Sequence, residues 1–235
     1  MLTIARQYLT DFFNLFYPNI CLTCSNALLK GEMVLCFRCE NELPQTDHCF
    51  EAENKLVKRF WGRVPLQGAV ALYHFTKGGA IQHLLHSLKY KGRKDAGEYC
   101  GKLLGRKLRQ PNSIIKNVDL IVPVPLHWKK QQLRGYNQCE PFAKALADTI
   151  NVPYSFTALQ RTHENVSQTR KTRFDRWGNV AEIFSVKDTA QLQGKHILLV
   201  DDVVTTGATA EACIQTILQV PNTKVSFAAI AAAAR

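Results

Sequence analysis

Short apolar runs alternate with amphipathic stretches along most of the chain, and this alternation limits the folds open to it more than any other feature. The apolar runs are short enough for buried strands, whereas the stretches between them carry apolar residues at the i, i+3, i+4, i+7 spacing of helices. Strands separated by helices of this length predict a parallel sheet with helices on both faces. We expect strands at 69–75, 118–125, 196–200 and 224–235, an extended run at 152–161, and helices at 80–90, about 98–108, 139–150 and from about 209.

The length of the chain allows one large domain and a small appendage. The 235 residues, 46% of them hydrophobic, can bury a full core. An amphipathic helix is expected at about 3–16, and the charge-rich stretch 47–65 indicates a boundary near residue 60. The predicted domains are therefore 1–60 and 61–235.

The sequence contains neither a membrane span nor a signal peptide by the usual criteria. No run approaches the roughly 18 apolar residues that cross a bilayer. Asp11 and Asn14 interrupt the apolar N-terminal stretch, and no small-residue cleavage site follows. We expect a cytoplasmic protein with no membrane insertion.

The basic residues are concentrated in the larger predicted domain. Residues 1–60 hold six Lys or Arg and seven Asp or Glu, whereas residues 61–235 hold 24 and 12. Such an excess favours phosphate-bearing partners, either small metabolites or nucleic acid, although a solvated basic surface explains it equally well.

Four cysteines form two close pairs in the smaller predicted domain. Cys21 and Cys24 are separated from Cys36 and Cys39 by eleven residues. Two C-x-x-C turns can surround a tetrahedral Zn²⁺ with four thiolates, and disulfides fit a reducing cytoplasm poorly. We therefore predict a structural zinc site, to which His48 or Cys49 is a candidate additional ligand.

The stretch 196–210, HILLVDDVVTTGATA, places two acids and a hydroxyl-rich loop at the end of a predicted buried strand. A helix beginning near Thr209 would direct free N–H groups toward the loop, where a monophosphate binds well. Gly207 permits close backbone approach. Asp201 and Asp202 are suited to accept hydrogen bonds from vicinal sugar hydroxyls. The combination predicts a ribose 5-phosphate ligand.

Other phosphate motifs are absent. The string G-x-x-x-x-G-K-[ST] of a Walker loop does not occur, and G-x-G-x-x-G does not follow a first strand. A helix cap would explain one carboxylate but not the Thr-rich loop behind the pair.

The segment ILLVDDVVTTGAT resembles the phosphoribosyl pyrophosphate (PRPP) motif of type I phosphoribosyltransferases, with Ala208 where many of them have a second glycine. The wider chain resembles the ComF family, which includes the GntX-type proteins, through LFYPNICLTC…LCFRC, SLKYKGR, VPVPLHWKKQQLRGYNQ and RTHENVSQTRKTRFDRWGNV. The resemblance implies an α/β, parallel-sheet type I phosphoribosyltransferase fold with a small N-terminal zinc-binding segment. It implies catalytic roles for Asp201 and Asp202 and PRPP contacts from Val203, Val204, Thr205, Thr206, Gly207, Ala208 and Thr209.

Two basic segments are similar to the loops that bind pyrophosphate and close over PRPP in that family. Charge builds on the leaving pyrophosphate during transfer, so Mg²⁺ bound with PRPP and fixed cations must neutralise it. The first segment follows the strand 118–125, and the second begins at Arg161. Their candidate residues are His127, Lys129, Lys130, Arg134, Arg161, Lys171 and Arg173.

Two functions remain open from the sequence. The first is an Mg²⁺-dependent phosphoribosyltransferase, whose acceptor base no residue identifies. The second, implied by the ComF resemblance, is a non-catalytic protein that engages single-stranded DNA or a competence helicase during DNA uptake. The intact acid pair favours the first, because a pure DNA-binding protein would not need it.

Overall fold

The computed structural model describes residues 18–161 and 183–233. Its central feature is a four-stranded sheet of order β1-β6-β5-β2, in which every neighbouring pair is parallel. The strands are β1 (Ala69–Phe75), β2 (Leu120–Pro123), β5 (His196–Val204) and β6 (Lys224–Ala233), with the small pair β3 (Leu159–Arg161) and β4 (Phe184–Val186) outside the sheet. The helices are α2 (Phe37–Glu42), α3 (Lys55–Phe60), α4 (Ala80–Tyr90), α5 (Lys94–Leu108), α6 (Trp128–Arg134), α7 (Cys139–Ile150) and α8 (Ala208–Leu218), with a 3-10 turn, η2, at Thr189–Gln191.

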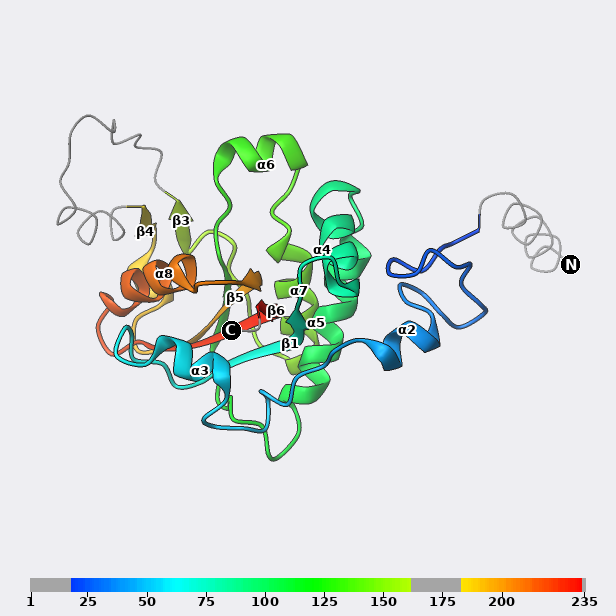
Figure 1. Cartoon of the computed structure of the whole chain (residues 1–235). Helices are drawn as coiled ribbons and strands as arrows, with labels where there is room; N and C mark the ends of the chain where they lie inside the picture. The colour runs from blue at the N-terminus through cyan, green and yellow to red at the C-terminus, as the bar shows by residue number, and fades with distance from the viewer. Residues whose placement is uncertain (1–17, 162–182, 234–235) are drawn as a thin grey trace, which may run out of the picture.

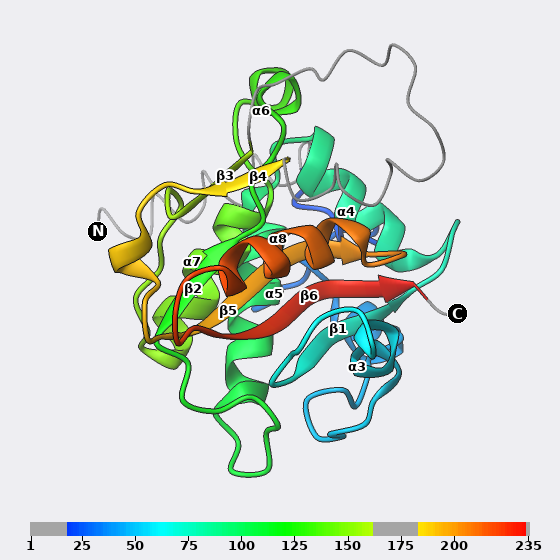
Figure 2. The same ribbon diagram turned by 90° about the vertical axis from the view of Figure 1, so that its left-hand side faces the viewer.

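Helices cover both faces of the sheet, as Figure 1 shows: α4, α5 and α7 lie on one side, and α3 and α8 on the other. The alternation of side chains along β5 produces the two cores. Leu198 and Val200 belong to the core under α4, α5 and α7, whereas Ile197 and Leu199 belong to the core under α8. Figure 2 looks onto the α8 face and shows the strand order. The predicted α/β fold with a parallel sheet is therefore confirmed.

Close contact between α5 and α7 places the beginning of α7 at the sheet. An added Cβ at Gly101 would lie 2.5 Å from the carbonyl oxygen of Phe142, and one at Gly105 would lie 2.6 Å from the side chain of Thr149. Only glycine at these two positions allows the helix backbones to approach so closely.

Most predicted elements match the observed ones, with two differences at the ends of sheet strands. The strand 69–75 and the helices 80–90 and 139–150 have the predicted bounds, whereas the strand predicted at 118–125 covers only 120–123. The strand expected at 196–200 continues through the acid pair to Val204, because residues 201, 203 and 204 still pair with β6.

The run 152–161 is extended but mostly outside the ladders. Tyr154 forms an isolated bridge with Ile121, and only 159–161 form a strand, which pairs antiparallel with β4. The predicted helix at 3–16 lies outside the described residues.

Residues 44–54 are attached to the outer edge of β1. Thr46 donates its backbone N–H to Leu72, and His74 donates its own to Pro44. The buried amide of Asn54 donates to the carbonyl oxygen of Ala69 and, through its oxygen, caps α3. The segment thereby protects an exposed strand edge. The domain boundary near residue 60 stays a prediction.

Across the described part of the chain, no helix combines the length and apolar character that a membrane crossing requires.

Candidate functional site

The acid pair lies at the carboxyl end of β5, in the middle of the sheet. Asp202 is 3% exposed and Asp201 is partly buried. Both sit between β2 and β6, the neighbours of β5 in the sheet. The sheet therefore places the pair at the edge where ligands of parallel α/β proteins bind.

The thiol of Cys139, at the first residue of α7, contacts the carboxylate of Asp201. The sulfur lies 3.4 Å from Oδ1 of Asp201. Burial, and then the charge of Asp201, raise the pKa of Cys139 well above its usual value. The thiol is therefore protonated and donates a hydrogen bond to the carboxylate. Burial, and then the negative charge of Asp202, raise the pKa of Asp201 to about 7. Asp201 thus changes its charge near neutral pH.

Lys89 of α4 forms an ion pair with Asp202. The Nζ atom lies 2.9 Å from Oδ2, and both side chains are largely buried. From the sequence, no individual role was predicted for Lys89, although it lies in SLKYKGR, one of the segments that resemble the ComF family.

The loop after β5 turns sharply into α8, and we call residues 203–209 the ligand loop. Because β5 runs to Val204, the turn itself begins at Thr205. Gly207 is the residue before α8 and has φ +84°, and an added Cβ would lie 3.1 Å from the ring of Phe60. Glycine is therefore required here for its backbone conformation and for its size. The loop and Asp201 line a small cavity of about 40 Å³, and the side chains of Thr205, Thr206 and Thr209 are exposed.

Two arginines in and just after α3 form hydrogen bonds with the ligand loop. Arg59 donates to the carbonyl oxygens of Thr205 and Ala233 at 2.6 Å each, and Arg63 donates to that of Thr206 at 3.1 Å. Arg63 also pairs with Glu211 in the first turn of α8. These hydrogen bonds fix the backbone carbonyls of Thr205 and Thr206 from the side of α3. Neither arginine carried a recognisable signal in the sequence.

The first basic segment leaves the sheet beside the acid pair. Val124, just after β2, donates its N–H to Val200 at 2.8 Å, so the chain departs next to Asp201. The predicted cations of this segment differ in their settings. Lys129 and Lys130 are exposed at the start of α6, whereas Arg134 donates to Gln138 at 2.6 Å and packs over the ring of Tyr90. His127 caps α6 by accepting from the N–H of Lys129.

Arg161 ends β3 and packs over the ring of Phe184 in β4. It lines a cavity of about 380 Å³ together with Trp128 and Gln131 of α6. Arg161 is thereby placed beside the first basic segment. Lys171 and Arg173 lie outside the described residues.

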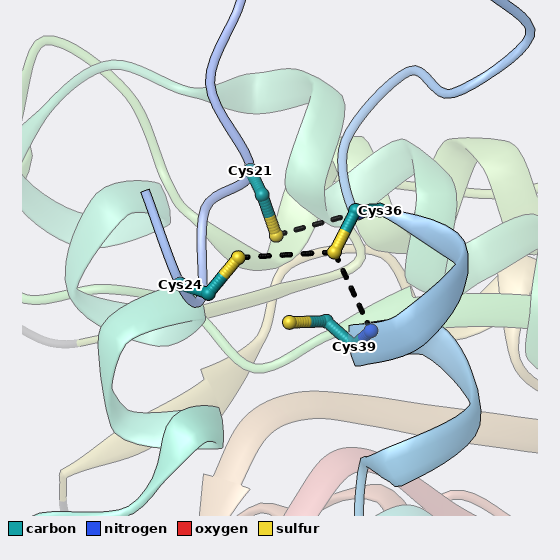
Figure 3. A group of neighbouring side chains, drawn as sticks. All are labelled: Cys21, Cys24, Cys36 and Cys39. Carbon is teal, nitrogen blue, oxygen red and sulfur yellow. Dashed lines mark hydrogen bonds between the residues drawn. The ribbon is translucent and has the colours of Figure 1, made fainter. Parts of the chain in front are cut away.

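The four paired cysteines form a cluster at the other end of the molecule, shown in Figure 3. Their sulfurs all lie within 4.8 Å of one another, and those of Cys24 and Cys36 are 3.7 Å apart. None is in a disulfide. Although burial acts to raise it, backbone N–H donors lower the pKa of Cys21 to about 6, which favours its thiolate. The cluster could hold a metal ion.

His48 and Cys49 are not part of this cluster as the described residues define it. Cys49 is 1% exposed, and burial raises the pKa of its thiol to about 11, as expected for a core residue.

Comparison with known proteins agrees with this geometry. Residues 137–235, which include the acid pair and the ligand loop, match the model of the phosphoribosyl transferase domain. The DNA utilization protein YhgH of Escherichia coli K12 is 27% identical over 202 residues, covering 85% of this chain and 84% of the relative. Competence protein F of Haemophilus influenzae is 23% identical, covering 83% and 88%. Competence protein ComFC of Bacillus subtilis is 31% identical over 101 residues, covering 43% and 38%.

Among solved structures, the glutamine PRPP amidotransferase of Bacillus subtilis aligns with a TM-score of 0.44 and 18% identity, over 62% of this chain and 30% of that one. The domain match covers β5, α8 and β6 and agrees with their place in a parallel sheet, so residues 137–235 form a phosphoribosyl transferase domain. The relatives that match both parts of the chain, YhgH and competence protein F, are named for DNA utilization and competence, and the chain is similar to them over more than four fifths of its length.

Proposed function

We propose that the protein binds PRPP with Mg²⁺ at the carboxyl end of β5 and transfers its phosphoribosyl group to an acceptor that the residues do not identify. The observation that carries this proposal is the conjunction of a buried acid pair with a preformed Thr-Gly loop at the start of a helix. The loop offers N–H groups and hydroxyls to the 5-phosphate. The acid pair offers acceptors to the two ribose hydroxyls.

The donor set at this edge also fits magnesium. Mg²⁺ prefers oxygen ligands and keeps several of its waters, so it needs only one or two carboxylates and the pyrophosphate oxygens. Asp201 and Asp202 would supply those carboxylates. The metal would neutralise charge on the leaving pyrophosphate, and Lys129, Lys130 and Arg161, with Lys171 and Arg173, would add cations.

The cysteine cluster fits zinc best. Four sulfurs within 4.8 Å of one another, on two C-x-x-C turns, match the tetrahedral thiolate sites that zinc occupies in proteins. All four positions are filled by protein sulfurs, so the role of the metal would be structural.

The decisive experiment is calorimetric titration of PRPP at fixed Mg²⁺. Wild type should bind, and the double variant Asp201→Asn/Asp202→Asn should bind at least about tenfold more weakly, since charge-assisted hydrogen bonds contribute about 1.5–3 kcal/mol each. Glu98→Gln, an exposed acid on α5, removes a charge away from the site and should leave the affinity unchanged. Equal affinity in wild type and the double variant, or no binding by wild type, would show that the acid pair has been misread.

The relatives favour a second role, in DNA uptake in the cytoplasm, through single-stranded DNA or a helicase partner. They are named for competence and DNA utilization, and residues 61–235 carry the whole basic excess of the chain. Single-stranded DNA should then bind with little sequence preference and lose affinity steeply between about 50 and 200 mM salt. Affinity that stays constant over this range would contradict an electrostatic mode of binding.

A further inference from the structure

A second cavity lies where β1 and β6 end against α3, behind the ligand loop. Its volume is about 230 Å³. It shares no lining residue with the cavity of the ligand loop. The lining consists of His48, Lys55, Leu56, Arg59, His74, Ala232 and Ala233.

The lining of this cavity is cationic. Lys55 and Arg59 bring two positive charges, and none of the described residues that line the space carries a carboxylate. The nearest acid that acts on His48 is Asp47, whose side chain is exposed, so solvent screens it. His74 lies beside His48, with the ring centroids 5.8 Å apart and the planes almost perpendicular. The charge of the cavity therefore favours an anion.

His48 brings a polar atom that the fold leaves unsatisfied. The residue is 5% exposed, and its Nδ1 atom has no hydrogen-bond partner among the described residues. Burial, followed by the charges of His74 and Arg59, lowers the pKa of His48 to about 4, so the ring is neutral at pH 7 and carries one N–H. A buried polar group without a partner is unfavourable, and a ligand oxygen would remove this cost.

We propose that the cavity behind the ligand loop binds a small phosphate-type anion, inorganic phosphate or pyrophosphate. His48 donates a hydrogen bond to it, and Lys55 and Arg59 supply the positive charge. The volume is below the roughly 300–1,000 Å³ of sites for drug-sized ligands, so the cavity suits the anion alone rather than a whole nucleotide. This inference does not depend on PRPP binding at the acid pair.

The choice of variants follows from the contacts of the lining residues. Arg59 is unsuitable, because it also holds the ligand loop through Thr205 and the end of β6 through Ala233. Lys55 is exposed at the first residue of α3, so Lys55→Gln removes a cation of the cavity with little effect on folding. Lys58→Gln, on the same helix but outside the lining, is the matched control.

The experiment follows the histidine rings by NMR while inorganic phosphate, and separately pyrophosphate, is added at constant ionic strength. The ring signals of His48 and His74 are assigned from His48→Gln and His74→Gln. We expect both to shift saturably, with affinity about tenfold weaker in Lys55→Gln and unchanged in Lys58→Gln. The response should persist in Thr206→Val, which alters the ligand loop instead.

Three results would overturn the proposal. The ring signals would remain in place at saturating anion, or sodium chloride would shift them equally, or Lys55→Gln and Lys58→Gln would bind alike. A single-stranded oligonucleotide that shifts the rings where free phosphate does not would assign the surface to nucleic acid and reject the small anion.

Discussion

The cysteine cluster and the acid pair are both compact groups of polar ligands, but the chain supports them in opposite ways. Around the cysteines, large apolar side chains are left in solvent: Leu29, Met33 and Phe37 are 57–72% exposed. The acid pair stands on a strand whose preceding residues, Ile197 to Val200, are completely buried. The comparison teaches that the sheet creates the setting of the acid pair, whereas the proposed zinc would have to stabilise much of the cysteine segment.

The strongest test of this difference is loss of one metal ligand. Cys36→Ser should lower the zinc content below about half an equivalent and expose the amides of residues 18–42 to rapid hydrogen exchange, because structural zinc binding contributes about 10 kcal/mol or more to folding. The amides of β5 should remain protected, because Ile197 to Val200 are buried between the helices on both faces of the sheet. Cys21 and Cys39 only extend one of these two cores. Zinc analysis and hydrogen exchange measure both effects.

Lys30→Ala, in the same region but not a ligand, should change neither measurement. If the sheet lost protection together with the cysteine segment, the two regions would be one cooperative unit and the contrast between them would fail.

The next largest effect is expected at the ion pair inside the sheet edge. Lys89→Met leaves Asp202 buried without its cation and should lower the free energy of unfolding by about 2–4 kcal/mol, since breaking a buried pair strands a charge. Urea unfolding followed by circular dichroism measures this change. Lys91→Met, an exposed lysine two residues on, is the control and should be nearly neutral.

Adding Asp202→Asn to Lys89→Met should recover much of the loss, because the stranded charge is then removed. A double variant as unstable as the single one would mean that Lys89 acts through packing.

The smallest effect is a pH dependence from Asp201. Its folded pKa, about 7, lies above its value in the unfolded chain, so the folded state binds the proton more tightly. The associated stability is complete below about pH 4 and is lost as the pH rises through 7. Because the residue is partly exposed, the loss should not exceed about 1–2 kcal/mol.

Urea unfolding of wild type and Asp201→Asn between about pH 4 and 8, a range that includes the whole expected loss, tests this. The free-energy difference between the two proteins should change with pH in favour of the variant. A free-energy difference that does not change with pH would mean that a group other than Asp201 titrates in this range. By contrast, the stability of the cysteine segment should depend on its metal content.

The sequence by itself determined the fold class and the residues of the two candidate sites. The strand at 69–75, the helices at 80–90 and 139–150, the cysteine pairs and the acid pair with its loop were all predictable, because each depends on a local pattern: periodicity, spacing within a turn, or a motif. The end of the strand predicted at 196–200 could not be predicted, because acids normally favour solvent. Only pairing with the neighbouring strand β6 continues β5 to Val204.

Tertiary structure decided which distant residues complete each site. Lys89 meets Asp202, Cys139 meets Asp201, and Arg59 meets Thr205 across separations of 62 residues or more. It also decided that His48 lines a cavity with Lys55 rather than joining the cysteines. The physical reason is that two groups form an ion pair or a hydrogen bond only when they lie close together in space. The packing of α3, α4 and α7 on the sheet sets these distances, and no local pattern in the sequence contains them.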